Sequence, residues 1–108
     1  MITLHFDGGG QVITITIKGK NVFFSNYSLG LKNVPIEKMF TRSNALSIIK
    51  SYPELAYLPH DEVISIGIEK WMKRIDDAYK DLGEQGIKKY VIDDMHSHGL
   101  IYIGGNDE

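Results

Sequence analysis

The segment Gln11-Val12-Ile13-Thr14-Ile15-Thr16-Ile17-Lys18 carries the clearest strand signal in the chain. Its isoleucines occupy every second position and polar residues fill the positions between them, so an extended backbone places them on opposite faces. β-Branched side chains also favour the pleated surface of a sheet. The segment therefore predicts a β-strand with one face in the core and one face in water.

Similar patterns on either side of this segment extend it into a meander. The residues of Ile2-Thr3-Leu4-His5-Phe6 alternate between apolar and polar, which predicts a first strand. Three glycines in Asp7–Gly10 permit the positive φ angles of a tight reversal. Gly19–Asn21 predicts a second turn, and residues 22–31 are expected to continue the meander.

The middle of the chain has helical signals. Pro35 suits the first position of a short helical turn over residues 36–40. Ser43 is the expected cap of a second short helix. Pro53 disfavours the helical conformation of the residue before it, so this second helix is expected to end at Tyr52.

The longest predicted helix covers Asp61–Leu82, and Gly83 is its expected C-terminal stop. One apolar stripe with spacings of three and four residues follows its length: Ile64, Ile68, Trp71, Ile75, Ala78 and Leu82. Such a stripe is typical of a helix that lies across a sheet. Met72 and Tyr79 flank the stripe and widen it, so Trp71, Met72 and Tyr79 are expected to form an interaction surface for another protein or for a homodimer.

The C-terminal part returns to β propensity. Tyr90–Ile92 and Leu100–Ile103 are short apolar runs that predict a β-hairpin, followed by a frayed polar tail over residues 104–108. Segregated strands, helices and a hairpin indicate an α+β class. We therefore expect residues 1–108 to form a single domain. Its antiparallel sheet, made of the N-terminal meander and the C-terminal hairpin, would pack against one long and one or two short helices.

A cluster of polar residues lies between the two apolar runs. In an extended chain, Asp94, His96 and His98 would point to one face. Imidazoles with a carboxylate suit a divalent transition metal such as zinc, and three protein ligands leave a place for a reactive water. In the alternative interpretation, His98-Gly99 is the centre of a tight turn and the histidines are turn residues.

His96-Ser97-His98 is similar to the His-x-His of the zinc motif in JAMM-type isopeptidases. In that family an aspartate about ten residues further on is the third ligand and an upstream glutamate activates the water. Asp107 would take the ligand position but follows after only eight intervening residues, and no upstream glutamate lies on an early predicted strand. The chain departs from the motif at Gly99, where the family usually has proline, and at Gly104, where it has serine. Because the likeness is confined to this stretch, we do not assign the chain to that family.

Bulk properties narrow the classes of function. The chain has 108 residues, a net charge of −2 and no cysteine. A chain without cysteine fits a reducing, cytoplasmic setting, and no apolar run is long enough to span a membrane. A dedicated nucleic-acid binder is disfavoured because the basic residues form no stripe. The candidate stacking surface for single-stranded nucleic acid consists of Phe23, Phe24 and Tyr27.

The leading hypothesis is a small protein-interaction or regulatory domain without its own active site and without a cofactor. The first alternative is a metal-dependent hydrolase, with Asp94, His96 and His98 as ligands and Glu62 or Asp93 as general base. The second alternative is a single-stranded nucleic-acid binder.

Overall fold

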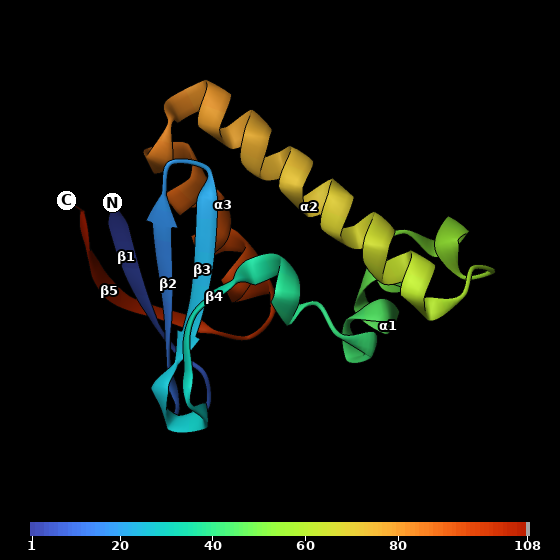
Figure 1. Cartoon of the computed structure of the whole chain (residues 1–108), viewed down its shortest axis with the longest axis horizontal. Coiled ribbons are helices and arrows are strands. Elements are labelled where there is room, and N and C mark those ends of the chain that lie inside the picture. Colours follow the sequence, from blue (N-terminus) through green and yellow to red (C-terminus); the bar gives the residue numbers. More distant parts are fainter. Residues whose placement is uncertain (108) are drawn as a thin grey trace.

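The computed structural model describes residues 1–107, except for the side chains of Arg42 and Ser43. Its sheet is antiparallel, with the strand order β4-β3-β2-β1-β5 (Figure 1). The strands are β1 (Ile2–Asp7), β2 (Val12–Lys18), β3 (Asn21–Asn26), β4 (Leu31–Pro35) and β5 (Ile101–Asp107). The predicted N-terminal meander is therefore confirmed, and the C-terminal strand lies beside the first one.

The register joins the apolar positions of neighbouring strands on one face of the sheet. Leu4 of β1 pairs with Ile15 of β2, and both side chains are fully buried. Thr3 pairs with Thr16 on the opposite face, where both side chains remain partly exposed. The period-two pattern of the sequence thus decides which face of the sheet receives the helices.

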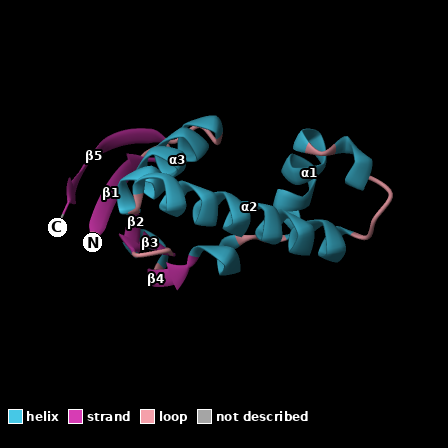
Figure 2. Cartoon of the chain, turned by 90° about the horizontal axis from the view of Figure 1, so that it is seen from above, coloured by secondary structure: helices cyan, strands magenta, loops and turns pink. Residues whose placement is uncertain are grey.

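The helices lie on that apolar side of the sheet, as Figure 2 shows. The α-helices are α1 (Arg42–Ser51), α2 (His60–Leu82) and α3 (Glu84–Ser97), and the 3₁₀ turns are η1 (Tyr27–Leu29), η2 (Ile36–Met39) and η3 (Pro53–Leu55). The N-terminal half of α2 projects beyond the sheet, and α1 packs against it there. Within residues 1–107, no helix combines the length and the apolar character needed to cross a bilayer.

The predicted helix that ends at Tyr52 and the long helix predicted over Asp61–Leu82 are confirmed as α1 and α2, with changes in detail. The most buried positions of α2 follow a strict four-residue spacing: Val63, Gly67, Trp71 and Ile75. α1 begins at Arg42, with Thr41 as its cap. The Thr41 N–H donates to Asn44 Oδ1 at 2.6 Å, which satisfies a backbone donor at the helix start. Ser43 is therefore inside the first turn, and its side chain lies outside the described residues.

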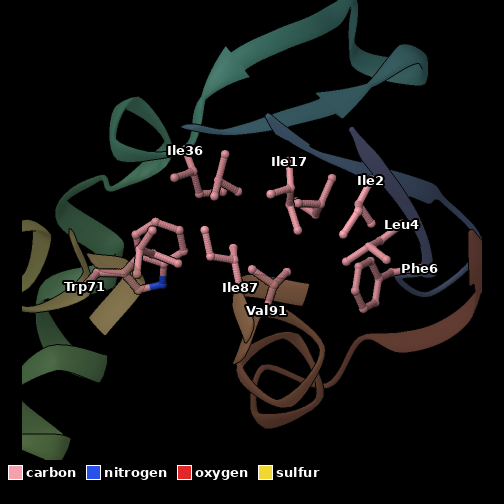
Figure 3. Close-up of a cluster of buried hydrophobic side chains, with 11 residues drawn as sticks. Ile2, Leu4, Phe6, Ile17, Ile36, Trp71, Ile87 and Val91 are labelled. Atoms are coloured by element: carbon pink, nitrogen blue, oxygen red, sulfur yellow. The ribbon is translucent and has the colours of Figure 1, made fainter. Parts of the chain in front are cut away.

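The first strand of the predicted C-terminal hairpin is wrong, because residues 84–97 form α3. Tyr90–Ile92 resembles a strand in isolation, but Ile87 and Val91 are one helical turn apart and are both fully buried. Figure 3 shows these two side chains directed at Ile17 and at Leu4 of the sheet. A helical conformation buries this face against the strands, and the solvent side keeps the charged residues.

A single residue reverses the chain between α2 and α3. Gly83 has φ 63° and ψ −142°, which an L side chain would strain. Gly86 then lies against α2, so closely that an added Cβ would be 2.1 Å from the Ala78 carbonyl oxygen. The two helices pack together at this point because residue 86 has no side chain.

The predicted fraying of residues 104–107 is also wrong, because they belong to β5 and pair with β1. A Cβ on Gly105 would be 2.0 Å from the Thr3 carbonyl oxygen, so glycine permits this close approach. Asp107 accepts a hydrogen bond from Gln85 Nε2 at 2.8 Å and pairs with Lys88 at 3.3 Å. Both contacts lower the pKa of Asp107 and tie β5 to α3. Glu108 lies outside the described residues.

The close approach of α2 and α3 generates a first prediction. Gly86→Ala should lower the free energy of unfolding by about 2 kcal/mol, since overpacking against the Ala78 backbone outweighs the better helix propensity of alanine. Urea denaturation measures this change. Lys89→Ala, on the exposed side of α3, is the control and should change stability by less than about 0.5 kcal/mol. A Gly86→Ala protein as stable as the wild type would contradict the helix packing.

Candidate functional site in a groove between helices

A groove of about 330 Å³ opens between α1 and α3, with α2 between them. This volume is at the lower end of the range for small-molecule sites in proteins. We call it the α1–α3 groove. The lining residues that matter here are Ile48 and Tyr52 on the α1 side, Gly67, Lys70, Trp71 and Arg74 on α2, and Tyr90, Asp94, Met95 and His98 on the α3 side.

One face of α2 forms the floor of the groove. Gly67, Lys70, Trp71 and Arg74 are three or four residues apart and therefore share a side of the helix. An added Cβ on Gly67 would be 2.4 Å from Ile48 Cδ1, so the Ile48 side chain of α1 packs directly against the α2 backbone at this glycine.

Trp71 is the aromatic centre of the groove. Its ring packs edge-on against Phe40, with 6.3 Å between centroids, and is tilted against Tyr90 at 6.0 Å. The indole N–H donates to Asp94 Oδ2 at 3.4 Å, a long hydrogen bond that orients the ring. Trp71 is 8% exposed and belongs to the core cluster.

The other two members of the predicted interaction surface are more accessible. Met72 is 39% and Tyr79 36% exposed. The Lys20 Nζ atom lies 5.6 Å from the centre of the Tyr79 ring, so Tyr79 faces the turn between β2 and β3. Met72 and Tyr79 do not line the α1–α3 groove, whereas Trp71 does.

The sequence interpretation did not include the cationic end of the groove. Lys70 Nζ lies 4.5 Å from the centroid of the Tyr52 ring, and Arg74 Cζ lies 5.8 Å from it. Arg74 Nη2 also donates to the Tyr52 hydroxyl. Both cations therefore attach the end of α1 to α2 through one aromatic ring. The signal for this pair was their spacing of four residues on one helix face.

Tyr90 contributes a buried hydroxyl to the α3 wall. Burial raises the pKa of Tyr90, and the nearby Tyr90 hydroxyl is the main reason that the pKa of Arg74 is also raised. The contact with Arg74 lies outside ordinary hydrogen-bond geometry, and no described residue satisfies the buried Tyr90 oxygen. The Tyr90 hydroxyl thus has a hydrogen-bonding position that a ligand could fill.

The predicted metal ligands lie at the end of α3 rather than in an extended segment. His98 Nδ1 is 2.8 Å from the Asp94 carbonyl oxygen, and His96 Nε2 accepts the Tyr102 N–H at 3.4 Å. Gly99, with φ 85°, ends the helix. The Gly99 N–H donates to the His96 carbonyl oxygen, and the Leu100 N–H donates to the Met95 carbonyl oxygen. This pattern is a Schellman motif, so the turn interpretation is correct for Gly99.

The helical geometry does not bring the predicted ligands together. Asp94 and His98 line the α1–α3 groove, whereas His96 does not. Asp107 is on β5, bonded to Gln85 and Lys88. No group of three histidine, aspartate or glutamate side chains among the described residues is arranged to hold a metal ion.

The predicted stacking surface for nucleic acid is also divided. Phe24 pairs with Ile15 and lines the α1–α3 groove, whereas Phe23 pairs with Thr16 on the open face of the sheet. Tyr27 is 63% exposed in η1. The two phenylalanines therefore point to opposite sides of the sheet.

The geometry at the end of α3 generates a second prediction. Protein purified without a histidine tag should contain much less than one zinc, iron or manganese per chain by elemental analysis. Asp94 and His96 lie on α3 and His98 is its C-cap residue, so their side chains do not converge on one point as three ligands of a metal would. The double variant His96→Ala/His98→Ala should have the same metal content. One equivalent of metal in the wild type, lost in the double variant, would contradict this geometry.

Comparison with protein-family models, curated proteins and solved structures finds no match to this chain. A fold of this class can carry many functions, so function has to be argued from the side chains of a particular site. The α1–α3 groove is the site that these side chains define best.

Proposed function

We propose that this chain is a small protein-interaction or regulatory domain without its own active site, and that it binds its ligand in the α1–α3 groove. The observation that carries the proposal is the groove itself. It is about 330 Å³ in volume, with aromatic and aliphatic walls and a few charged groups among its lining residues. Largely apolar concavities with few convergent polar groups are the usual form of ligand sites.

The state of the polar side chains favours binding over catalysis. Asp94 accepts the Trp71 indole N–H, and His98 lies against the last turn of α3. Both groups thus support the walls of the groove. A general base must reach the substrate proton that it abstracts, and each of these two side chains is directed to a partner within the protein.

The position of α1 indicates how a bound ligand would act on the structure. α1 packs mainly against α2 and η3, beyond the edge of the sheet (Figure 1). A ligand in the groove would touch α1 on one side and α3 on the other, and so add contacts between them. Because such a ligand binds the folded state, it would also stabilise that state by mass action. We place this function in the cytoplasm, which suits a chain without cysteine.

A neutral fluorescent probe tests the proposal. N-Phenyl-1-naphthylamine is apolar and emits strongly when it leaves water. Trp71 is the only tryptophan of the chain and lies in the groove, so energy transfer from it reports a bound probe nearby. We expect saturable transfer with one probe per chain and a rise in melting temperature.

Two matched variants locate the bound probe. Ser47→Phe places a bulky ring in the groove and should weaken probe binding about tenfold, because it fills the space that the probe needs. Ser65→Phe makes the same change on an exposed part of α2 that does not line the groove, and should leave binding unchanged. Equal binding by both variants, or no binding by the wild type, would refute the proposed site.

A further inference from the structure

From the cations at one end of the α1–α3 groove, we infer that its ligand is a small organic acid. This acid would have an apolar body against Trp71 and a carboxylate held by Lys70 and Arg74. The inference rests on the proposed function, because it names the chemical class of ligand for that same groove.

The charges of Lys70 and Arg74 are not neutralised by a carboxylate of any described residue. Lys70 and Arg74 both contact the Tyr52 ring, and neither forms an ion pair with any residue that the structure describes. What distinguishes them from the other unpaired lysines is that both line the groove and contact the same aromatic ring. Two cations one helical turn apart, without a carboxylate between them, have charge and hydrogen-bond donors available for an anion.

The α3 wall of the groove carries a carboxylate. Asp94 lies on the α3 side and is engaged with the Trp71 indole. Its negative charge disfavours a second anion on that wall. The anionic group of a ligand is therefore expected beside Tyr52, where Lys70 and Arg74 both contact the ring. There the donors of Lys70 and Arg74 are on one face of α2.

Apolar side chains of the groove select the body of the ligand. Phe40, Trp71 and Met95 also line the groove, together with Ile36 and Leu100. These side chains offer aromatic and aliphatic contact and few hydrogen bonds, so they select an apolar group. A ligand that satisfies both ends combines such a group with one carboxylate and is small enough for about 330 Å³.

A matched pair of ligands tests the inference. 2-Naphthoate and 2-naphthamide have the same ring system and nearly the same shape, but only the first carries a charge. Displacement of N-phenyl-1-naphthylamine gives both affinities. At low salt we expect naphthoate to bind about tenfold more tightly, since hydrogen bonds to a charged group are the stronger ones. This advantage should shrink as sodium chloride is added, and naphthamide binding should not change.

Variants of α2 assign the preference to its source. Lys70→Met and Arg74→Met should each reduce the affinity for naphthoate and leave that for naphthamide within about twofold. Lys70→Met also keeps the hydrogen bond from Arg74 to Tyr52, so α1 stays attached in that variant. Lys73→Met is the control, because Lys73 is exposed on α2 and does not line the groove.

The outcomes separate this inference from the proposed function. A naphthoate preference that is lost with Lys70 or Arg74, and kept in Lys73→Met, supports the organic-acid ligand. Equal affinities for the two compounds, or a preference that persists in both groove variants, overturn the organic-acid ligand but leave the groove as a binding site. Failure of N-phenyl-1-naphthylamine to bind the wild type refutes the groove itself.

Discussion

The rest of the structure depends on the close packing of α3 between α2 and the sheet. Gly83 reverses the chain, and Gly86 lets α3 approach the backbone of α2 at Ala78. Only in that position can Ile87 and Val91 reach the apolar face of the sheet (Figure 3). The same placement turns the opposite edge of α3 toward α1, and so creates the second wall of the groove. Core and site thus share one constraint, the absence of a side chain at residue 86.

Local pattern was sufficient for the elements whose apolar periodicity is long or regular. The alternation in Val12–Lys18 and the apolar stripe in His60–Leu82 are both longer than the periodic patterns found in loops. Both elements form as predicted. α3 was missed because Tyr90–Ile92 puts three apolar residues in a row, which a short buried strand and a helix can share. The spacing from Ile87 to Val91 was the helical signal. The pairing of residues 104–107 with β1 required knowledge of the sheet order, which no local pattern contains.

The candidate site shows the same division. Sequence reasoning selected Trp71, Asp94 and His98, all of which line the groove, but it grouped them with Met72, Tyr79 and His96, which do not. The metal-site hypothesis required an extended segment around His96, whereas a helix end directs His96 to Tyr102. Sequence reasoning did not single out Lys70 and Arg74. Their role depends on Tyr52, which only the tertiary packing of α1 brings to them.

The most direct test of the central claim is an NMR measurement of contacts from bound N-phenyl-1-naphthylamine to the methyl groups of the protein. A ligand in the groove must be close to Ile48 on α1 and to Met95 on α3 at the same time. We expect intermolecular NOEs from one bound molecule to both of these residues. NOEs confined to Ile101 and Ile103, which are more than half exposed on β5, would contradict it.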